Sequence, residues 1–445
     1  MSKSVVYTQK YVLKNVIEYM ERLVTQQLNA WKASTHRKPL ILNGARQVGK
    51  TWALREFAHT CYAKEAYIVC RKNALIAEVF RQGFDTDRLL RSLRVISGVD
   101  ITPNDTLIIL DEIQEVPEAI EALKYFCEEA PQYHIAVAGS LLGLSLHNRV
   151  SFPVGKVDIL HLYPMNFYEF LLAKGEGEAC KLLQARDYAT MRLLHSKYVD
   201  LLRQYFYVGG MPEAVRAYVE TGGVNEVRTI QQNILRGYEL DFSKHAPREQ
   251  VERIRMVWQS IPAQLFKENK KFVYGALRKG ARAKDFELAI QWLIDAGLLY
   301  KVSNCSKIAL PLSIYEEFSV FKLYLSDVGL LGAMAHTDAS QVLIDDKAFT
   351  EYKGGFTEQY VLQQMLSEHL GPIYYHKADN SRLEIDFLMQ RQGFLVPIEV
   401  KGGTHVRANS LSALLKSDAS LHAIRYSMLP YQEQGNLTCI PLYAV

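Results

Sequence analysis

The fold of the N-terminal part is decided by the stretch Gly44-Ala45-Arg46-Gln47-Val48-Gly49-Lys50-Thr51. An apolar run over residues 39–43 precedes it, and a helical pattern over residues 52–58 follows it. In this order of strand, glycine loop and helix, backbone N–H groups point inward and cradle phosphate. Lys50 would reach the terminal phosphates, and the hydroxyl of Thr51 is a ligand for Mg²⁺. The stretch therefore predicts a nucleotide-binding P-loop that uses all eight residues.

The composition is that of an ordinary globular protein, with 49% hydrophobic and 22% charged residues among 445. A chain of this length predicts about two to four domains. The formal net charge of +4 is too small to indicate a nucleic-acid partner, so any basic surface must be local. The six cysteines form no C-x-x-C pair, and no apolar run reaches the ~18 residues of a spanning helix. We expect a cytoplasmic protein with reduced thiols and no membrane partner.

A second signal is an aliphatic run that ends in two acids, Asp111 and Glu112. A continuous apolar run such as residues 106–110 is typical of a parallel strand covered on both faces. Its carboxylates then lie at the edge where ligands bind in open α/β sheets. Asp111 would hold Mg²⁺, directly or through water, and Glu112 would orient and polarise the attacking water. Together with Lys50, Glu112 predicts hydrolysis of ATP with Mg²⁺ as cofactor.

The next predicted strand, residues 134–138, ends in Gly139 and Ser140. Ser140 would read the γ-phosphate or the lytic water, and a simple turn is the alternative. In the loop that follows, Arg149 or Lys156 could supply the cation that phosphoryl transfer uses. A solvated charge is the alternative for each of them.

Five motifs together resemble the prokaryotic AAA-type ATPases that carry an uncharacterised C-terminal region. They are Gly44–Thr51, Leu110–Gln114, Gly139-Ser140, Tyr163–Phe170 and the Gly-Gly-x-Pro stretch within Tyr207–Glu213. The resemblance implies a five-stranded sheet in which another strand separates the P-loop strand from the Asp-Glu strand. It also implies a helical lid over residues 165–245 and sites completed between subunits. Members are expected to carry Gly-Arg where this chain has Gly155-Lys156, so the identity of an arginine finger stays open.

Two glycines interrupt the helical pattern of the predicted lid. Gly209 and Gly210 end one helix, and Pro212 begins the next at its first turn, where proline is tolerated. A hinge moved by the nucleotide state and a plain interhelix turn are both consistent with this pattern.

The region of residues 248–340 suggests a winged helix. Two predicted helices, 251–267 and 286–296, flank a basic stretch, and residues 298–302 and 321–325 would form the wing. The cations of the basic stretch are Lys270, Lys271, Arg278, Lys279, Arg282 and Lys284. They could meet DNA phosphates or form a solvated face, and winged helices also bind proteins.

A second group of charged residues occurs near the C-terminus. Glu399 and Lys401 share one strand face because side chains alternate, and Asp386 can meet them across a hairpin. Asp386 and Glu399 would bind Mg²⁺, and Lys401 would stabilise the nucleophile or the developing charge of phosphodiester hydrolysis. Glu358, on a preceding helix, would complete the metal shell, and Glu384 could assist.

The pattern D-x12-E-x-K resembles the PD-(D/E)xK restriction-endonuclease-like superfamily. The resemblance implies a mixed sheet flanked by helices and, in active members, metal-dependent DNA cleavage. Ile385 stands where the proline of the motif is expected. A nuclease fold kept as a non-cleaving scaffold is the alternative.

The sequence therefore predicts an α/β protein with four parts: an AAA-type P-loop NTPase core (1–164), a helical lid (165–247), a winged-helix-like domain (248–340) and a PD-(D/E)xK nuclease-like domain (341–445). The predicted function is ATP hydrolysis coupled to a DNA-binding, nuclease-like domain. A nucleotide-switched signalling or protein-remodelling ATPase is the alternative. ATP, DNA, a protein partner and a second copy of the chain are the expected partners.

Overall fold

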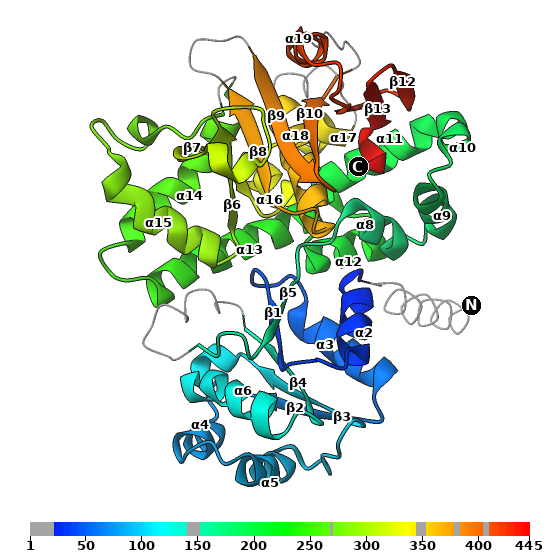
Figure 1. Ribbon diagram of the computed structural model, residues 1–445. Coiled ribbons are helices and arrows are strands. Elements are labelled where there is room, and N and C mark those ends of the chain that lie inside the picture. Colours follow the sequence, from blue (N-terminus) through cyan, green and yellow to red (C-terminus); the bar gives the residue numbers. More distant parts are fainter. Residues whose placement is uncertain (1–21, 140–151, 268–269, 344–352, 378–382, 404–408) are drawn as a thin grey trace, which may run out of the picture. The chain divides into compact units, whose positions relative to one another are not determined.

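The computed structural model describes residues 22–139, 152–267, 270–343, 353–377, 383–403 and 409–445. These residues fall into two compact units (Figure 1). One unit contains residues 22–163 together with 295–297. The other contains residues 164–294 together with 298–445. The boundaries predicted at 247/248 and 340/341 therefore lie within a single unit.

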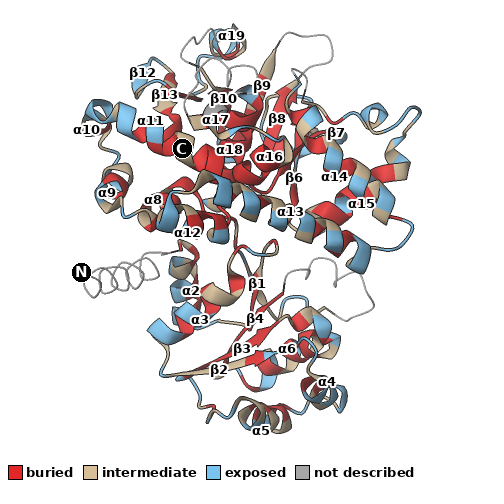
Figure 2. Ribbon diagram, turned by 180° about the vertical axis from the view of Figure 1, so that it is seen from behind, coloured by how far each residue is buried: buried red, intermediate tan, exposed pale blue. Residues whose placement is uncertain are grey.

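The first unit is built on a five-stranded parallel sheet with the order β2-β3-β4-β1-β5. Its strands are β1 (Leu40–Asn43), β2 (Lys64–Val69), β3 (Thr106–Asp111), β4 (His134–Ala138) and β5 (Asp158–His161). The strand β4 lies between β1 and β3, so the strand number and the separation implied by the AAA-type resemblance are confirmed. Every residue of β3 and β4 is buried, as expected for parallel strands covered on both faces (Figure 2).

Helices cover both faces of this sheet. They are α2 (Val24–Ala33), α3 (Lys50–Cys61), α4 (Ala74–Arg81), α5 (Thr86–Ser97) and α6 (Pro117–Glu129), with the short η1 (Ile113–Glu115) after β3. Local signals set their starts: the side chains of Asn73 and Asp85 accept the backbone N–H groups of Ile76 and Arg88. The helix α2 precedes β1, and residues 1–21 lie outside the described residues.

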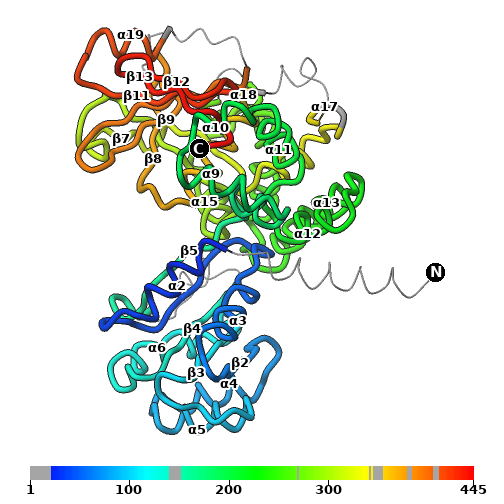
Figure 3. The backbone as a smooth tube through the Cα atoms, turned by 90° about the vertical axis from the view of Figure 1, so that its right-hand side faces the viewer, coloured from blue at the N-terminus to red at the C-terminus, as the bar shows by residue number. Residues whose placement is uncertain are grey.

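The second unit combines helices with a mixed eight-stranded sheet. Its helices include α8 (Phe167–Ala173), α9 (Gly177–Ala185), α10 (Tyr188–Leu193), α11 (His195–Val208), α12 (Pro212–Thr221), α13 (Val224–His245), α14 (Val251–Leu265), η2 (Tyr274–Ala276), α15 (Ala283–Asp295), η3 (Leu312–Tyr315), α16 (Val328–Met334), α17 (Ala339–Leu343), α18 (Lys353–Ser367), α19 (Asn409–Ser417) and η5 (Leu442–Ala444). The stretch predicted as a lid is thus helical. The C-terminal η5 lies beside α11, where the rings of Tyr198 and Tyr443 stack with centroids 4.7 Å apart (Figure 3).

The eight strands have the order β12-β13-β11-β10-β9-β8-β6-β7. They are β6 (Leu299–Cys305), β7 (Glu316–Leu325), β8 (Ile373–Lys377), β9 (Glu384–Arg391), β10 (Phe394–Lys401), β11 (Ala423–Ser427), β12 (Gln432–Gln434) and β13 (Leu437–Pro441). The strands predicted as a wing, β6 and β7, pair with each other and extend this sheet, because β6 also pairs with β8 at Ser303 and Asn304. The predicted wing is therefore the edge of a larger sheet.

Close backbone packing explains the glycine pair after α11. The N–H of Gly210 donates to Asp327 Oδ2 at 2.6 Å, and a Cβ at Gly210 would lie 1.9 Å from the carbonyl oxygen of Met165. Gly209 has a φ of +71°. Pro212 begins α12 at its first turn, as predicted. The packing requires glycine here, and the hinge stays a prediction.

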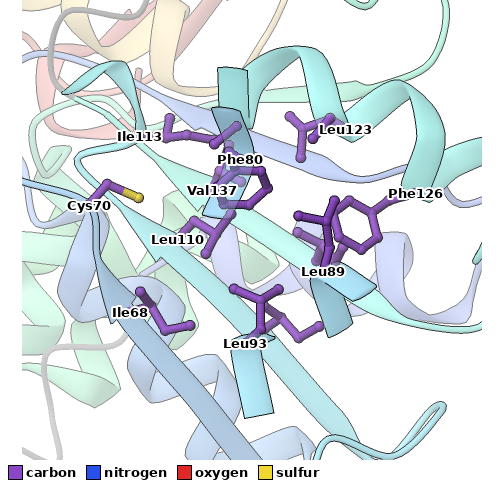
Figure 4. Packing of buried hydrophobic residues seen from close by; sticks show 14 of the residues in the cluster. Ile68, Cys70, Phe80, Leu89, Leu93, Leu110, Ile113, Leu123, Phe126 and Val137 are labelled. Carbon is purple, nitrogen blue, oxygen red and sulfur yellow. The ribbon is translucent and has the colours of Figure 1, made fainter. Parts of the chain in front are cut away.

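The core of the first unit lies between the sheet and three helices on one of its faces (Figure 4). Ile68, Leu110 and Val137 come from neighbouring strands and pack against Phe80 of α4 and Phe126 of α6. This buried layer fixes the sheet and therefore the strand ends from which the site residues project. Among the described residues, no helix combines the length and apolarity that crossing a membrane requires.

Candidate nucleotide site

The P-loop follows β1 and has backbone torsions that few residues other than glycine adopt. Gly44 has a φ of +152° and Gly49 a φ of +93°, and Gln47 between them is also left-handed at +67°. A Cβ at Gly44 would lie 2.2 Å from the carbonyl oxygen of Leu162. The loop therefore needs glycine at its first position for a packing reason as well as a conformational one.

Lys50 is the first residue of α3 and lies folded into the loop. Its side chain is buried, and Nζ donates to the carbonyl oxygens of Gly44 and Ala45, both at 2.7 Å. Burial lowers the pKa of Lys50 to about 8, although Glu112 and Asp111 oppose this effect. The group is still mostly ammonium at pH 7, and an anion beside it would favour that form.

Thr51 and Asp111 lie beside each other. The hydroxyl of Thr51 donates to Asp111 Oδ2 at 2.8 Å, and the backbone N–H of Glu112 donates to Asp111 Oδ1 at 3.0 Å. The register of the parallel strands carries Asp111 to the carboxyl end of β3, next to the P-loop helix. A hydroxyl and a carboxylate are oxygen donors of the kind that Mg²⁺ prefers.

Glu112 lies where β3 ends and the chain turns. Its φ of +51° is left-handed, which is uncommon for a residue other than glycine and frequent at functional sites. The side-chain amide of Gln114, in η1, donates to Glu112 Oε2. The turn and the amide of Gln114 together orient the Glu112 carboxylate.

Sequence reasoning missed Tyr67, which belongs to β2. Its hydroxyl donates to Asp111 Oδ2 at 2.8 Å, the oxygen that also accepts from Thr51. The guanidinium of Arg55, in α3, lies 4.8 Å from the centroid of the Tyr67 ring. The feature that could have identified Tyr67 is a tyrosine in β2, the strand that pairs with β3, at whose end Asp111 lies.

Arg22 was also missed. It is buried, and its guanidinium donates to the carbonyl oxygens of Val48 at 2.8 Å and Tyr163 at 2.7 Å. It therefore ties the P-loop to the segment after β5. Arg22 precedes Val48 by 26 residues, and no local sequence pattern predicts that an arginine at this distance contacts the P-loop.

The remaining predicted residues of this site differ in outcome. Ser140 and Arg149 lie outside the described residues. Lys156 is partly exposed and forms an ion pair with Glu128 at 2.8 Å, so it has a surface partner within its own unit.

Glu358 is paired with two lysines in the structure. This side chain of α18 is buried, and Lys270 pairs with Oε1, while Lys322 lies 3.7 Å from Oε2. The hydroxyl of Tyr324 donates to Oε2 at 3.1 Å. Burial alone would raise the pKa of Glu358, but the two lysines and Tyr324 lower it to about 2.

Asp386 lies in the same buried region. The N–H of Val400 donates to its Oδ2 at 2.8 Å, and burial together with the Glu358 charge raises the pKa of Asp386 to about 7. Glu384, two residues earlier, pairs with Lys322 at 3.3 Å and with Lys377 at 2.8 Å.

Glu399 forms a separate pair of contacts. Lys401 lies 3.1 Å from Oε1, and Arg425 of β11 lies 3.1 Å from Oε2. In the part of the chain that the structure describes, no three His, Cys, Asp or Glu residues are placed to hold a metal ion. The metal roles of Glu358, Asp386 and Glu399 and the catalytic role of Lys401 stay predictions.

Family models match three separate stretches of the chain. Residues 36–171 match a family model described as an AAA domain. Residues 199–341 and 353–444 match two domains of unknown function, DUF8612 and DUF4143. Each model spans less than half of the chain. No curated protein matches the sequence.

Solved structures give weak similarities. The Walker-type ATPase PABY2304 of Pyrococcus abyssi has 14% identity and a TM-score of 0.43, over 70% of this chain and 94% of that one. The Orc1 protein of Aeropyrum pernix, solved in complex with DNA, has 14% identity and a TM-score of 0.28, over 71% and 90%. Protein VC1899 of Vibrio cholerae has 12% identity and a TM-score of 0.17, over 91% and 94%. These TM-scores are too low to support an inference.

The AAA family match and the fold agree with the geometry of the site. The parallel sheet places the P-loop of β1 and the acid pair of β3 at one edge, with β4 between them. Thr51 and Asp111 are joined there by a hydrogen bond. Residues 36–171 are thus similar to AAA domains, and they have the parallel sheet and the P-loop that this similarity implies.

Proposed function

We propose that this domain binds ATP with Mg²⁺ and hydrolyses it. The observation that carries the proposal is the hydrogen bond between Thr51 and Asp111, with Lys50 and Glu112 adjacent to them. In the proposed reaction, Lys50 compensates charge on the terminal phosphates, and Glu112 orients and polarises the attacking water. Thr51 and Asp111 would hold Mg²⁺, which when bound neutralises charge on the β- and γ-phosphates.

ATP turnover by three forms of the full chain tests this proposal. We expect Lys50→Ala to lose both nucleotide affinity and turnover, because the ammonium contacts phosphate in the ground state and in the transition state. We expect Glu112→Gln to keep its affinity for ATP and lose turnover, since only the water is affected. Unchanged turnover by Lys50→Ala would show that the nucleotide site is wrongly assigned.

We further propose that the nucleotide state controls the C-terminal region through DNA binding. In support, four cations of the predicted basic stretch are exposed: Arg278, Lys279, Arg282 and Lys284. Exposed arginine and lysine can neutralise phosphate without base specificity. A plasmid-nicking assay with Mg²⁺ or Mn²⁺ tests the nuclease step. Wild type should cut faster than Asp386→Ala and Lys401→Ala, and equal rates across DNA and RNA substrates would exclude cleavage by this site.

The alternative is a signalling or protein-remodelling ATPase whose nuclease-like region binds without cutting. It is favoured by the pairing of Glu358 with Lys270 and Lys322, which compensates this buried carboxylate without a metal. Stimulation of ATP turnover separates the two functions. A DNA-coupled ATPase should be stimulated by DNA, whereas a remodelling ATPase should respond to a protein substrate and ignore DNA.

A further inference from the structure

The carboxylate of Asp111 accepts three hydrogen bonds from uncharged donors. Oδ2 accepts from the hydroxyls of Thr51 and Tyr67, both at 2.8 Å, and Oδ1 accepts from the N–H of Glu112 at 3.0 Å. A carboxylate offers about four acceptor positions. Among the residues that the structure describes, both positions on Oδ2 are therefore occupied and one position on Oδ1 is left.

Tyr67 is itself held in place by a set of contacts between α3 and β2. The guanidinium of Arg55 lies over its ring at 4.8 Å, and Arg55 Nε donates to Glu65 Oε1 at 2.9 Å. His59 Nε2 lies 2.9 Å from Glu65 Oε2. Glu65 and Tyr67 are two residues apart on a strand and share its face.

The helix side of this contact has the matching periodicity. Thr51, Arg55 and His59 follow one another at intervals of four residues, which places them on one face of α3. This face of α3 contacts Glu65 and Tyr67 of β2. The hydroxyl of Thr51 from the helix and the hydroxyl of Tyr67 from the strand both donate to Asp111 Oδ2. The phenol is thus fixed at its ring and at its oxygen.

The hydroxyl of Tyr67 remains a donor at physiological pH. A tyrosine hydroxyl ordinarily titrates at about pH 10, so it carries its proton at pH 7. Tyr67 can therefore orient the carboxylate without adding or removing charge.

We propose that Tyr67 is a positioning residue for the magnesium site of this ATPase: it fixes the Asp111 carboxylate and leaves one acceptor position, on Oδ1, for Mg²⁺ or a water bound to it. This inference rests on the proposed function, since it concerns the same nucleotide site. It goes beyond that function by assigning a role to a residue of β2 that belongs to neither the P-loop nor the acid pair.

Tyr67→Phe isolates the hydroxyl because the ring and its contact with Arg55 are retained. We measure binding of a fluorescent ATP analogue to the full chain, with Glu112→Gln present throughout to prevent turnover. Each form is measured in excess Mg²⁺ and in EDTA. We expect Tyr67→Phe to reduce the enhancement of affinity by Mg²⁺ about tenfold, the size of a lost hydrogen bond to a charged group, and to leave affinity in EDTA unchanged.

Tyr62→Phe is the matched control. Tyr62 lies just before β2, and its hydroxyl contacts His134 Nδ1 at 2.7 Å instead of Asp111. It should leave the Mg²⁺ enhancement intact. An equal enhancement in Tyr67→Phe and in the parent, or an equal loss in Tyr62→Phe, would overturn the proposal.

Asp111→Asn distinguishes positioning from a general effect on folding. Tyr67→Phe should cause no additional loss of the Mg²⁺ enhancement in this background, because Tyr67 acts through the carboxylate. The same loss in both backgrounds would overturn the proposal. Failure of the proposed function is separately visible, since Lys50→Ala would then bind the nucleotide analogue as well as the parent does.

Discussion

Acidification should destabilise the nucleotide-binding unit through one buried imidazole, that of His134. This residue begins β4 and contacts the rings of Trp31 and Tyr62, with centroid distances of 6.0 and 5.3 Å. Tyr62 Oη lies 2.7 Å from Nδ1, and Nε2 is buried and has no hydrogen-bond partner in the described part of the chain. Burial, followed by the nearby cations Arg37 and Lys32, lowers the pKa of His134 from 6.5 to about 4.

The sign of the effect follows from proton linkage. Between about pH 4 and 6.5 the unfolded chain binds a proton at this residue and the folded chain does not, so stability falls as the pH falls. The stabilisation is complete above pH 6.5 and is lost progressively down to about pH 4. At 1.36 kcal/mol for each pKa unit, lowering the pH from 7.5 to 5 should cost about 2 kcal/mol at this residue.

His134→Gln removes the titration, since its amide carbonyl can still accept a hydrogen bond from Tyr62. We expect the stability difference between wild type and this variant to shrink by about 2 kcal/mol from pH 7.5 to pH 5. Hydrogen exchange of peptides from β4, corrected for the intrinsic pH dependence of exchange, measures that difference. Trp31→Phe perturbs the same aromatic cluster without a titrating group and should give a pH-independent difference. Parallel pH curves for wild type and His134→Gln would refute the reasoning.

Three other changes test separate parts of the structure. Gly210→Ala should destabilise the second unit by about 3 kcal/mol or more in urea unfolding, because the added Cβ would meet the Met165 carbonyl. The control is Gly237→Ala in α13, where the added Cβ has open space around it and should stabilise the unit by about 0.5–1 kcal/mol. Glu358→Gln should lower the free energy of unfolding in urea by about 3–5 kcal/mol, because Lys270 and Lys322 lose this buried counter-ion. Its control, Glu287→Gln at an exposed position, should change that free energy by less than about 0.5 kcal/mol. Arg22→Ala should weaken nucleotide binding about tenfold in a fluorescence titration because the Val48 carbonyl loses its donor, and an unchanged affinity would show that the P-loop keeps its shape without Arg22.

The parts of the fold that sequence reasoning anticipated are those with local signals. The P-loop, the acid pair and the aliphatic strands can each be recognised from a few consecutive residues. The place of β4 between β1 and β3 is what the family resemblance implies. The roles of Tyr67 and Arg22 could not be predicted, because their partners are distant in the sequence. Strand pairing brings Tyr67 to Asp111, and the tertiary fold brings Arg22 to the P-loop. The same limit applies to β6 and β7. The sequence predicts them as the wing of a winged helix, but the parallel pairing of β6 with β8 joins segments about seventy residues apart.

Comparison of the two carboxylate clusters suggests a physical criterion for a magnesium site. Asp111 is oriented by two hydroxyls and one amide, which fix its direction without adding charge, and the nearby Lys50 donates to P-loop carbonyl oxygens. Glu358 is oriented by two ammonium groups and one hydroxyl, so its charge is already balanced.

A divalent cation gains most at a carboxylate that is held but not neutralised, because it need not first displace another cation. We therefore expect Mg²⁺ to bind first at Thr51 and Asp111. Binding at Glu358 would require Lys270 to leave, and a Lys270→Met variant would remove that competitor. If metal-dependent cleavage belongs to the C-terminal region, this variant should need less Mg²⁺ than wild type. An unchanged Mg²⁺ requirement would show that Glu358 is not one of the metal ligands.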